Sequence, residues 1–365
     1  MNTKALITLG LLLAATAGNQ IVAQTKTKNS DNSKVIPTVS KSRAYLFTYF
    51  EGSGKNQEAL RFAVSEDAVN WHALNGNQPV LNSADISNTG GIRDPHILRG
   101  AHNDGYYIVA TDMHTLKDGW GFNPGLVLLH SDDLVHWTHS AIDFTKQYPE
   151  KFGNVKWVWA PQTVYDPQAG KYLVYFTIHY KGAQEADSIN PKRSTLDFYC
   201  AYANEDFTGF ESEPQLMWSP TYGAIDGDII PDENGLLHFF FKGNLKDAKG
   251  KEYKNGIAQA TSNSLNGPWH EDGLFVDAYQ DTKTGVEGSG VFKLNPKDCK
   301  NGKTEYILMY DLFGSGRYEF QRTNDLFHFT EKPESFTKDF FPRHGTVMPI
   351  TKKELKTLEK AFGTK

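Results

Sequence analysis

The sequence predicts an all-β protein, a five-bladed β-propeller, and two repeats along the chain carry this prediction. The first repeat is a short phrase rich in Asp, Asn and Ser that closes on an aromatic residue, and it occurs at 65–71, 131–137, 203–210, 261–269 and 323–329. The second is a strand with polar residues at its start, which opens at Asp94, at the Ala160-Pro161-Gln162 corner, and at Asp226, Glu287 and His344. Five copies of each indicate five structural units.

Each unit contains four strands. The aromatic phrase is expected to form a turn between two antiparallel strands, because Asp, Asn and Ser side chains bond to turn backbone and the aromatic ring fills the space between sheets. An alternating apolar run such as 125–130 precedes the turn, and a stronger run such as 105–111 precedes that one. With the polar-opening strand and the strand after the turn, the unit is a four-stranded blade of a propeller.

The two ends of the repeat region are expected to close the ring. The first unit, from Ala44 to about Leu81, lacks a polar-opening strand, whereas the last such strand, 344–350, has no strands after it. Pairing the two completes a fifth blade and protects both sheet edges. A short C-terminal helix follows over 351–362, with a Thr351…Glu354 capping box. Residues 44–365 are therefore expected to form one domain.

The first 23 residues are typical of a bacterial export signal. A short positive region, Met1–Lys4, precedes an apolar stretch over 5–17 that is too short for a membrane span, and small residues near Ala17 and Ala23 offer cleavage sites. Residues 24–43 are expected to be a flexible lead-in. We therefore expect an exported protein, periplasmic or extracellular, with no membrane span.

Composition excludes several classes of partner. The 38 basic and 43 acidic residues give a net charge of −5, and no basic block is long enough to follow a nucleic acid backbone. Cys200 and Cys299 lack metal-binding spacing and are expected to be unpaired. We expect a monomer that acts on a small or polymeric ligand other than nucleic acid.

The inner strands of a propeller line its central channel, and three of the five open on a carboxylate: Asp94, Asp226 and Glu287. Like charges in one small volume repel, so a purely structural role for all three is costly. Carboxyls that perturb one another's pKa supply the acid and base of glycosidic cleavage. A Ca²⁺ cage is the alternative use, but these residues come from separate blades and not from a compact ligand loop.

The ordered motifs resemble glycoside hydrolase family 43 over about 44–350; they are Asp94-Pro95-His96-Ile97, Trp159-Ala160-Pro161, Ile225-Asp226-Gly227-Asp228 and Glu287-Gly288. The resemblance implies inversion, with Asp94 as general base, Glu287 as general acid and Asp226 as the residue that tunes the acid. Inversion requires the acid and base carboxyls to lie about 6.5–9.5 Å apart. The sequence departs from the family at Asp228, which competes with Asp226, and at Ser289. We retain Asp226, because Asp228 lies two residues deeper along the strand.

Further residues are candidates for sugar binding. His344 opens the fifth inner strand, and the resemblance implies that a His there holds a water or a Ca²⁺ ion, so a metal in the channel is an expectation although none is required for the chemistry. Trp159 could stack on a sugar ring, with core packing as the alternative. The remaining candidates lie in loops: His114, Trp120 and Phe122 as a subsite wall, and Arg317 as a partner of a sugar hydroxyl.

These features favour an exo-acting α-L-arabinofuranosidase that works on plant cell-wall polysaccharide or oligosaccharide. A β-D-xylosidase is the first alternative, and an endo-arabinanase or endo-xylanase, which needs an open cleft, is the second. A non-catalytic carbohydrate-binding propeller belongs to a different class; it predicts no activity to lose in Asp94→Asn or Glu287→Gln. Fructan-cleaving propellers share an Arg-Asp-Pro phrase with Arg93-Asp94-Pro95, but their Asn-Asp-Pro-Asn and Glu-Cys motifs are absent.

Overall fold

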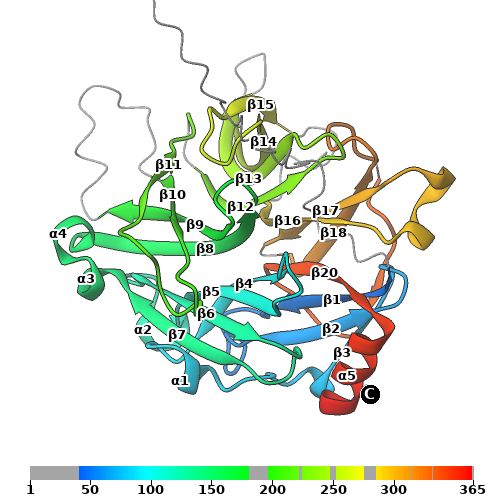
Figure 1. Ribbon diagram of the computed structural model, residues 1–365, viewed down its shortest axis with the longest axis horizontal. Coiled ribbons are helices and arrows are strands. Elements are labelled where there is room, and N and C mark those ends of the chain that lie inside the picture. The colour runs from blue at the N-terminus through cyan, green and yellow to red at the C-terminus, as the bar shows by residue number, and fades with distance from the viewer. Residues whose placement is uncertain are drawn as a thin grey trace, which may run out of the picture. The chain divides into compact units, whose positions relative to one another are not determined.

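Five antiparallel sheets surround a common centre (Figure 1). The computed structural model describes residues 41–180, 196–221, 224–246, 252–274, 285–313, 315–330 and 332–363, which all belong to one unit, 34–365. Neighbouring innermost strands contact each other in a closed ring, in the order β4 (Ile92–Arg99), β8 (Val155–Asp166), β12 (Ala224–Pro231), β16 (Glu287–Lys293), β20 (Gly345–Thr351) and back to β4. The predicted five-bladed β-propeller is therefore confirmed.

Three blades have the four strands that the repeat predicts. They are completed by β5 (Tyr106–Asp112), β6 (Gly125–Ser131) and β7 (Thr138–Asp143); by β9 (Lys171–Tyr180), β10 (Asp197–Tyr202) and β11 (Gln215–Trp218); and by β13 (Leu237–Lys246), β14 (Glu252–Ser262) and β15 (His270–Leu274). Within the described residues the β16 blade has three strands, adding β17 (Tyr306–Leu312) and β18 (Arg317–Thr323), and an isolated bridge from Thr323 to Phe329 stands in place of the fourth.

The fifth blade is built from both ends of the repeat region, as predicted. Strand β1 (Ser42–Tyr49) pairs antiparallel with β20, from Ser42 opposite Thr351 to Tyr49 opposite Gly345. Outside β1 lie β2 (Arg61–Ser65), β3 (Asn70–Ala73) and β19 (Thr337–Lys338); β19 runs parallel to β3 and was not predicted. The blade begins at Ser42, two residues before Ala44, while the predicted signal peptide (1–23) and the predicted lead-in as far as residue 40 lie outside the described residues.

The helices are short. The C-terminal helix α5 (Lys352–Phe362) begins at the predicted capping box of Thr351 and Glu354 and buries Leu355 and Leu358. The others are α1 (Ser83–Ile86), α2 (Thr115–Asp118), α3 (Phe144–Gln147), α4 (Pro149–Phe152) and the 3₁₀ turns at Asn75–Asn77, Pro296–Asp298 and Lys300–Gly302. In the described part of the chain, no helix has the length and apolar content that crossing a membrane requires.

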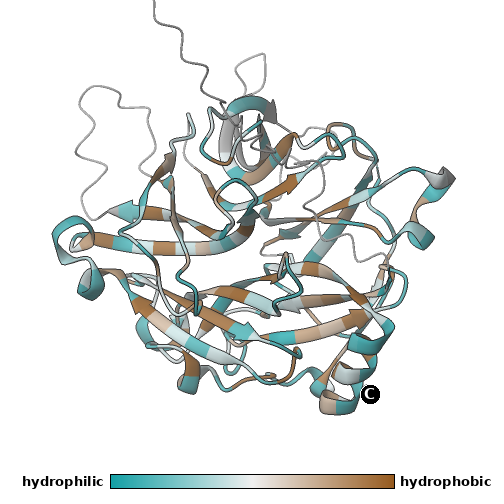
Figure 2. Ribbon diagram, viewed as in Figure 1, coloured by the Kyte–Doolittle hydropathy of each residue, from teal (hydrophilic) through white to brown (hydrophobic). Residues whose placement is uncertain are grey.

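The repeated phrase forms the turn that its composition predicts. In three copies the same Asp oxygen accepts two backbone N–H groups; Asp133, for example, accepts from Val135 at 2.9 Å and His136 at 2.8 Å. The closing aromatic packs against the preceding blade, as Trp137 does on Phe62 and Trp71 on Phe320. Figure 2 shows that many of the apolar residues lie on the strands of the blades. Cys200 and Cys299 are unpaired, as expected.

Replacing Asp133 with Ala should destabilise the fold by about 1–2 kcal/mol, because two backbone N–H groups lose their acceptor in the manner of a helix cap. The melting temperature should fall by about 2–4 °C. Asp132→Ala is the matched control, since that neighbouring side chain is 91% exposed. Equal melting temperatures for the two variants in calorimetry would contradict this role for the turn.

Candidate active site

A backbone feature shared by four inner strands directs the candidate side chains toward the channel. Four inner strands carry a β-bulge with one residue at positive φ: Asp94 (50°), Ala160 (46°), Asp226 (55°) and Gly288 (65°). The chain therefore places Gly288, and not Glu287, at the position equivalent to Asp94 and Asp226. Glu287 stands one residue earlier, level with Arg93, Trp159 and Ile225. The expectation that all three carboxylates open their strands at equivalent positions was wrong, because the residue at the bulge of this strand is Gly288 and Glu287 precedes it.

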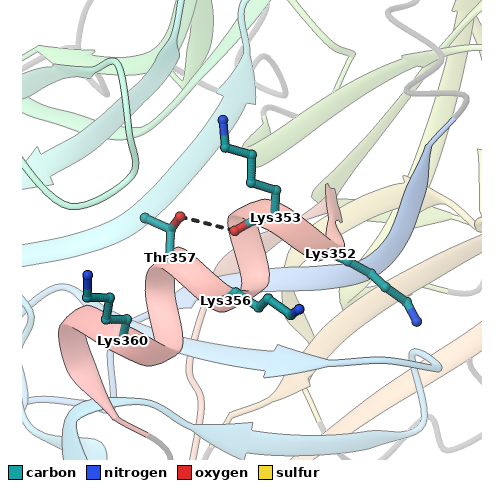
Figure 3. A pocket seen from close by; sticks show the side chains of 5 residues that line it. All are labelled: Lys352, Lys353, Lys356, Thr357 and Lys360. Carbon is teal, nitrogen blue, oxygen red and sulfur yellow. Dashed lines mark hydrogen bonds between the residues drawn. The ribbon is translucent and has the colours of Figure 1, made fainter.

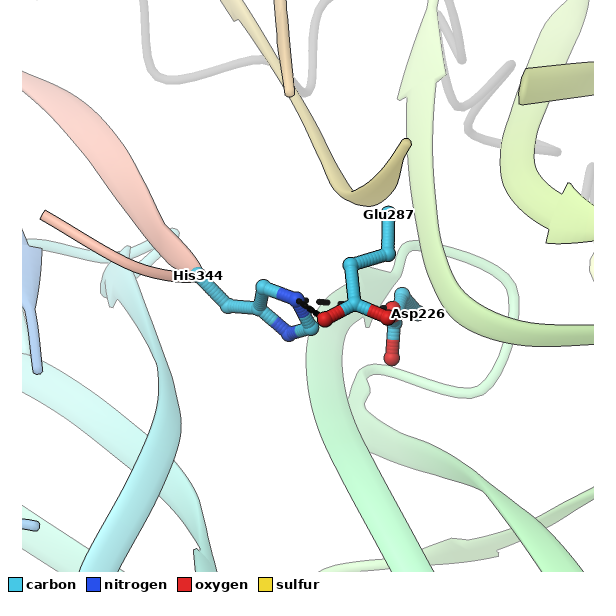
Figure 4. A group of neighbouring side chains, drawn as sticks. All are labelled: Asp226, Glu287 and His344. Carbon is cyan, nitrogen blue, oxygen red and sulfur yellow. Dashed lines mark ion pairs between the residues drawn. The ribbon is translucent and has the colours of Figure 1, made fainter. Parts of the chain in front are cut away.

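The imidazole of His344 lies among the three predicted carboxylates. Its Nδ1 is 2.9 Å from an oxygen of Asp94, and its Nε2 is 3.3 Å from Glu287 and 3.7 Å from Asp226. Figure 4 shows the ring beside the Glu287 and Asp226 carboxyls. The four side chains are mostly buried. The structure thus brings together the three residues predicted to be catalytic, with His344 between them.

These contacts set the charge of two of the groups. Burial opposes a charge on His344, but the surrounding carboxylates outweigh burial and raise its pKa well above the usual value, so the ring is a cation. Burial likewise opposes ionisation of Asp94, but the contact with His344, the nearby charge of Arg93 and a 2.8 Å bond from Thr111 together hold its pKa below the usual range. Asp94 is therefore an ionised, oriented carboxylate.

The pKa of Asp226 is shifted in the opposite direction from that of Asp94. Burial raises its pKa to about 6, and the charge of Glu287 adds to this effect. One oxygen accepts the backbone N–H of Gly288 at 3.0 Å, and Ser289 donates to the backbone carbonyl of Asp226 at 2.5 Å. The departure from the family pattern at Ser289 therefore fixes the Asp226 backbone.

Asp228, the competing carboxyl, lies elsewhere. It accepts the backbone N–H of Val291 at 2.7 Å and is 3.8 Å from His96, and burial raises its pKa to about 7. The contact with Val291 links the β12 blade to the β16 blade. The structure places Asp226, and not Asp228, against His344.

Glu287 is held by two cations that were not predicted. The ammonium of Lys242 is 2.6 Å from one oxygen, and the guanidinium of Arg343 is 2.8 Å from the other. Arg343 also pairs with Asp311, whose pKa burial raises. Burial alone would raise the pKa of Glu287, but His344 and Lys242 hold it well below its usual range. In this arrangement Glu287 is ionised, whereas its role by resemblance is that of an acid.

A pattern in the sequence could have pointed to Lys242, and to Asp311, the partner of Arg343. In each blade the second strand is an apolar run that closes on a polar residue, and that residue lies opposite the start of the inner strand; the set is Thr48, Thr111, Thr177, Lys242 and Asp311. Three of these, Thr111, Lys242 and Asp311, touch the carboxylates or their partners. Because antiparallel neighbours are directly opposed, the ends of the second strands border the same channel as the starts of the inner strands.

An aromatic wall stands beside Asp94. Trp159 stacks on Trp157 with ring centres 4.2 Å apart, and the edge of Trp120 meets Trp159 at 6.5 Å. The Arg93 guanidinium lies 4.9 Å from the Trp120 ring centre. Trp120 is 56% exposed and Phe122, on the same loop, is 43% exposed. Of the predicted sugar-binding residues, Trp159 and Trp120 therefore form one surface next to the site, and Phe122 extends the loop that carries it.

His114 and Arg317 are placed differently from these aromatics. His114 lies 3.8 Å from the buried Glu58 carboxylate, which also accepts from Thr115 and Arg93 and so anchors the loop. Arg317 opens β18, the third strand of its blade, and is 3.9 Å from Glu319. The arginine in contact with the predicted acid is Arg343. None of the contacts described for Arg317 links it to the three carboxylates.

The channel below the carboxylates is narrow. A small cavity lined by Asp94, Gln162, Asp226 and His344 has about 10 Å³ of space, about what one water needs. Asp226, Glu287 and His344 place three ligand atoms within 4.8 Å of one another. Ca²⁺ prefers six to eight oxygen ligands, whereas these residues offer two carboxyls and one ring nitrogen, and Glu287 already contacts Lys242 and Arg343. This donor set does not fit a Ca²⁺ ion.

A second hollow lies on the surface of α5 and is lined by side chains of that helix alone: Lys352, Lys353, Lys356, Thr357 and Lys360 (Figure 3). It is open and lined mainly by the apolar stems of the four lysines. It contains no carboxyl and no aromatic ring. The chemistry of a hydrolase therefore belongs to the channel and not to this hollow.

Comparison with known proteins agrees with the fold and with a glycosidase. A family model described as a probable glycosyl hydrolase domain matches residues 40–356. An α-L-arabinofuranosidase of Bifidobacterium longum is 27% identical over 335 residues, which cover 84% of this chain and 30% of that protein. The chain thus spans less than a third of the length of that relative.

Two solved structures share the fold. One is a family 43 arabinoxylan arabinofuranohydrolase from Bacillus subtilis, with a TM-score of 0.53 and 15% identity over 83% of this chain and 65% of that chain. The other is a xylan β-1,4-xylosidase from Bacillus halodurans, with a TM-score of 0.53 and 12% identity over 83% of this chain and 55% of that chain. At these identities the likeness concerns the fold. With the family model covering most of the sequence, the chain belongs to the family of probable glycosyl hydrolase domains related to glycoside hydrolase family 43.

Proposed function

We propose that this protein is an inverting, exo-acting α-L-arabinofuranosidase that acts on plant cell-wall polysaccharide or oligosaccharide. The observation that carries the proposal is the arrangement of two carboxyls, Asp94 and Glu287, on opposite nitrogens of one imidazole ring. Inversion needs the two carboxyls about 6.5–9.5 Å apart, so that a water fits between the base and the reacting carbon. The relative named as an arabinofuranosidase supports the choice of sugar.

Asp94 has the properties of the general base. It is ionised, and Thr111 and His344 hold its two oxygens in place. A carboxylate fixed in this way can accept a proton from a water as that water attacks the anomeric carbon. The proton that Asp94 takes from water balances the proton that Glu287 gives to the leaving oxygen, so each turnover leaves the total proton count unchanged.

Asp226 acts on the acid through position and charge. Its oxygen holds the N–H of Gly288, the residue directly after Glu287, so the backbone that carries the acid is fixed by its neighbour. The carboxyls of Asp226 and Glu287 share a buried volume, so a charge on one makes ionisation of the other less favourable. Asp226 therefore favours a protonated Glu287 whenever Asp226 itself is charged.

The aromatic wall is the proposed sugar-binding surface. Trp120 is 56% exposed, meets Trp159 edge to face, and has the guanidinium of Arg93, the residue before the proposed base, over one side of its ring. Indole faces bind the apolar face of a sugar ring, and they are large and rigid. A chain that reaches Asp94 from this side would rest on the wall formed by these rings.

Glu287→Gln should lower turnover on an arabinan-derived oligosaccharide by about 10²–10⁴-fold, the range for loss of an acid catalyst. The loss should be smaller for nitrophenyl α-L-arabinofuranoside, whose leaving group needs little protonation. Lys293→Met is the control and should retain activity, since Lys293 pairs with Glu233 and not with the three carboxylates. Wild-type protein that binds these sugars but hydrolyses neither them nor the β-D-xyloside would favour the non-catalytic propeller, and an anomeric NMR time course would test inversion.

His344→Gln should move the acidic limb of the kcat/KM profile to higher pH. The limb reports protonation of the base in the free enzyme. The His344 cation lowers the pKa of Asp94, so a neutral side chain of similar length lets that pKa rise. Kinetics across pH on the nitrophenyl substrate measure the effect, and a limb that stays in place would show that His344 does not set the charge of Asp94.

Chelation should leave activity unchanged, since the proposed acid and base are protein groups and the donors around His344 do not fit Ca²⁺. Activity is to be measured after dialysis against EDTA and again after addition of CaCl₂. A loss that Ca²⁺ restores would show a functional metal in the channel.

A further inference from the structure

The cations around Glu287 conflict with its proposed role as the general acid. A general acid must carry a proton, yet both oxygens of this carboxyl face cations: Lys242 on one, Arg343 and His344 on the other. A bound sugar must therefore change the surroundings of Glu287 before the carboxyl can act. One of the three cations has to withdraw.

Two of the cations are held in place by other partners. Arg343 pairs with Asp311 as well as Glu287, so it bridges β17 and β16. His344 also contacts Asp94 and Asp226, and its ring has little room because Gly288 lies against it. Moving either one would leave another buried carboxylate unpaired, which is costly.

Lys242 is the cation best placed to move. It comes from β13, the second strand of the Asp226 blade, and reaches across to the next blade, where its ammonium contacts Glu287 at 2.6 Å and lies 4.7 Å from the centre of the Phe313 ring. Its side chain is 15% exposed, less than the 25% of Arg343, but its described ion pair is with Glu287 alone, whereas Arg343 pairs with Asp311 as well. A lysine is a compact charge on a flexible stem, unlike the planar fork of arginine.

We propose that Lys242 is a positioning residue for Glu287, which it holds in place and keeps ionised until a bound sugar displaces the ammonium. This inference rests on the proposed function. Displacement removes one cation and excludes water, and both changes favour the protonated carboxyl. Lys242 thereby makes protonation of the acid depend on an occupied site.

The test replaces Lys242 with Met, which keeps the length of the stem and removes the charge, and with Arg, which keeps the charge. Lys293→Met is the matched control, because Lys293 forms an ion pair of the same 2.6 Å length with Glu233 on the surface of the β16 blade. The first readout is independent of activity: ¹³C NMR titration of the Glu287 carboxyl in glutamate-labelled protein, with the resonance identified by its absence in Glu287→Gln.

Lys242→Met should raise the pH at which Glu287 titrates, whereas Lys242→Arg and Lys293→Met should leave it near the wild-type position. The groups that face Glu287 in this titration are Lys242, Arg343, His344, Asp226 and Asp311. Kinetics should agree: the alkaline limb of kcat/KM, which reports loss of the acid's proton, should move to higher pH in Lys242→Met.

An unchanged Glu287 titration in Lys242→Met would overturn the inference, as would a fall in kcat with no movement of the alkaline limb. If the Met variant does not fold, Lys242→Gln replaces it, since Gln keeps polar contacts without the charge. A wild-type protein that hydrolyses no glycoside would reject the proposed function, while the titration would still decide whether Lys242 holds the carboxyl ionised.

Discussion

The rest of the site depends on the contacts of the His344 imidazolium with three carboxyls. Three buried carboxyls face one small volume, and without a cation between them at least one would have to bind a proton or move away. The ring contacts Asp94 through one nitrogen and Glu287 and Asp226 through the other. A single side chain from the closing blade thus permits residues of three other blades to converge.

Convergence also requires that the blades keep their positions around the channel. Inner strands pair on one side only, so their other edge has unpaired backbone groups, which are costly when buried. Side chains of the preceding blade satisfy them: Thr346 accepts from Ile97, His96 from Thr163, Tyr175 from Ile229 and Asp228 from Val291. The four N–H groups occupy the same place in each strand, three residues after the bulge. Asp228, which resembles a catalytic residue in sequence, belongs to this ring of contacts.

The sequence predicted the number and closure of the blades better than it predicted which residues lie next to the channel. Five turn phrases and five polar-opening strands were enough to predict the blades and their closure, because each phrase has a local cause in turn hydrogen bonds. The alternation of strand residues gives no sign of an inserted residue, so neither the bulge nor the place of Glu287 one residue before it was predicted. Arg317 lies at a strand end, but on the third strand of its blade. The sequence indicates the end of a strand without showing its distance from the channel, which is why Arg343 and Lys242 were missed.

The bulge position shows how one backbone conformation serves different chemistry in each blade. A positive φ near 50° costs energy for any residue with a side chain, and it is found at Asp94, Ala160 and Asp226. Two of these project a carboxyl to the site, and the N–H of the third, Ala160, donates to Thr111, which in turn holds Asp94. In the fourth blade the position is Gly288, where a Cβ would lie 2.2 Å from the His344 ring. The proposed acid therefore has to come from the residue before the bulge, since a side chain at the bulge itself would exclude the imidazolium that Asp94, Asp226 and Glu287 share.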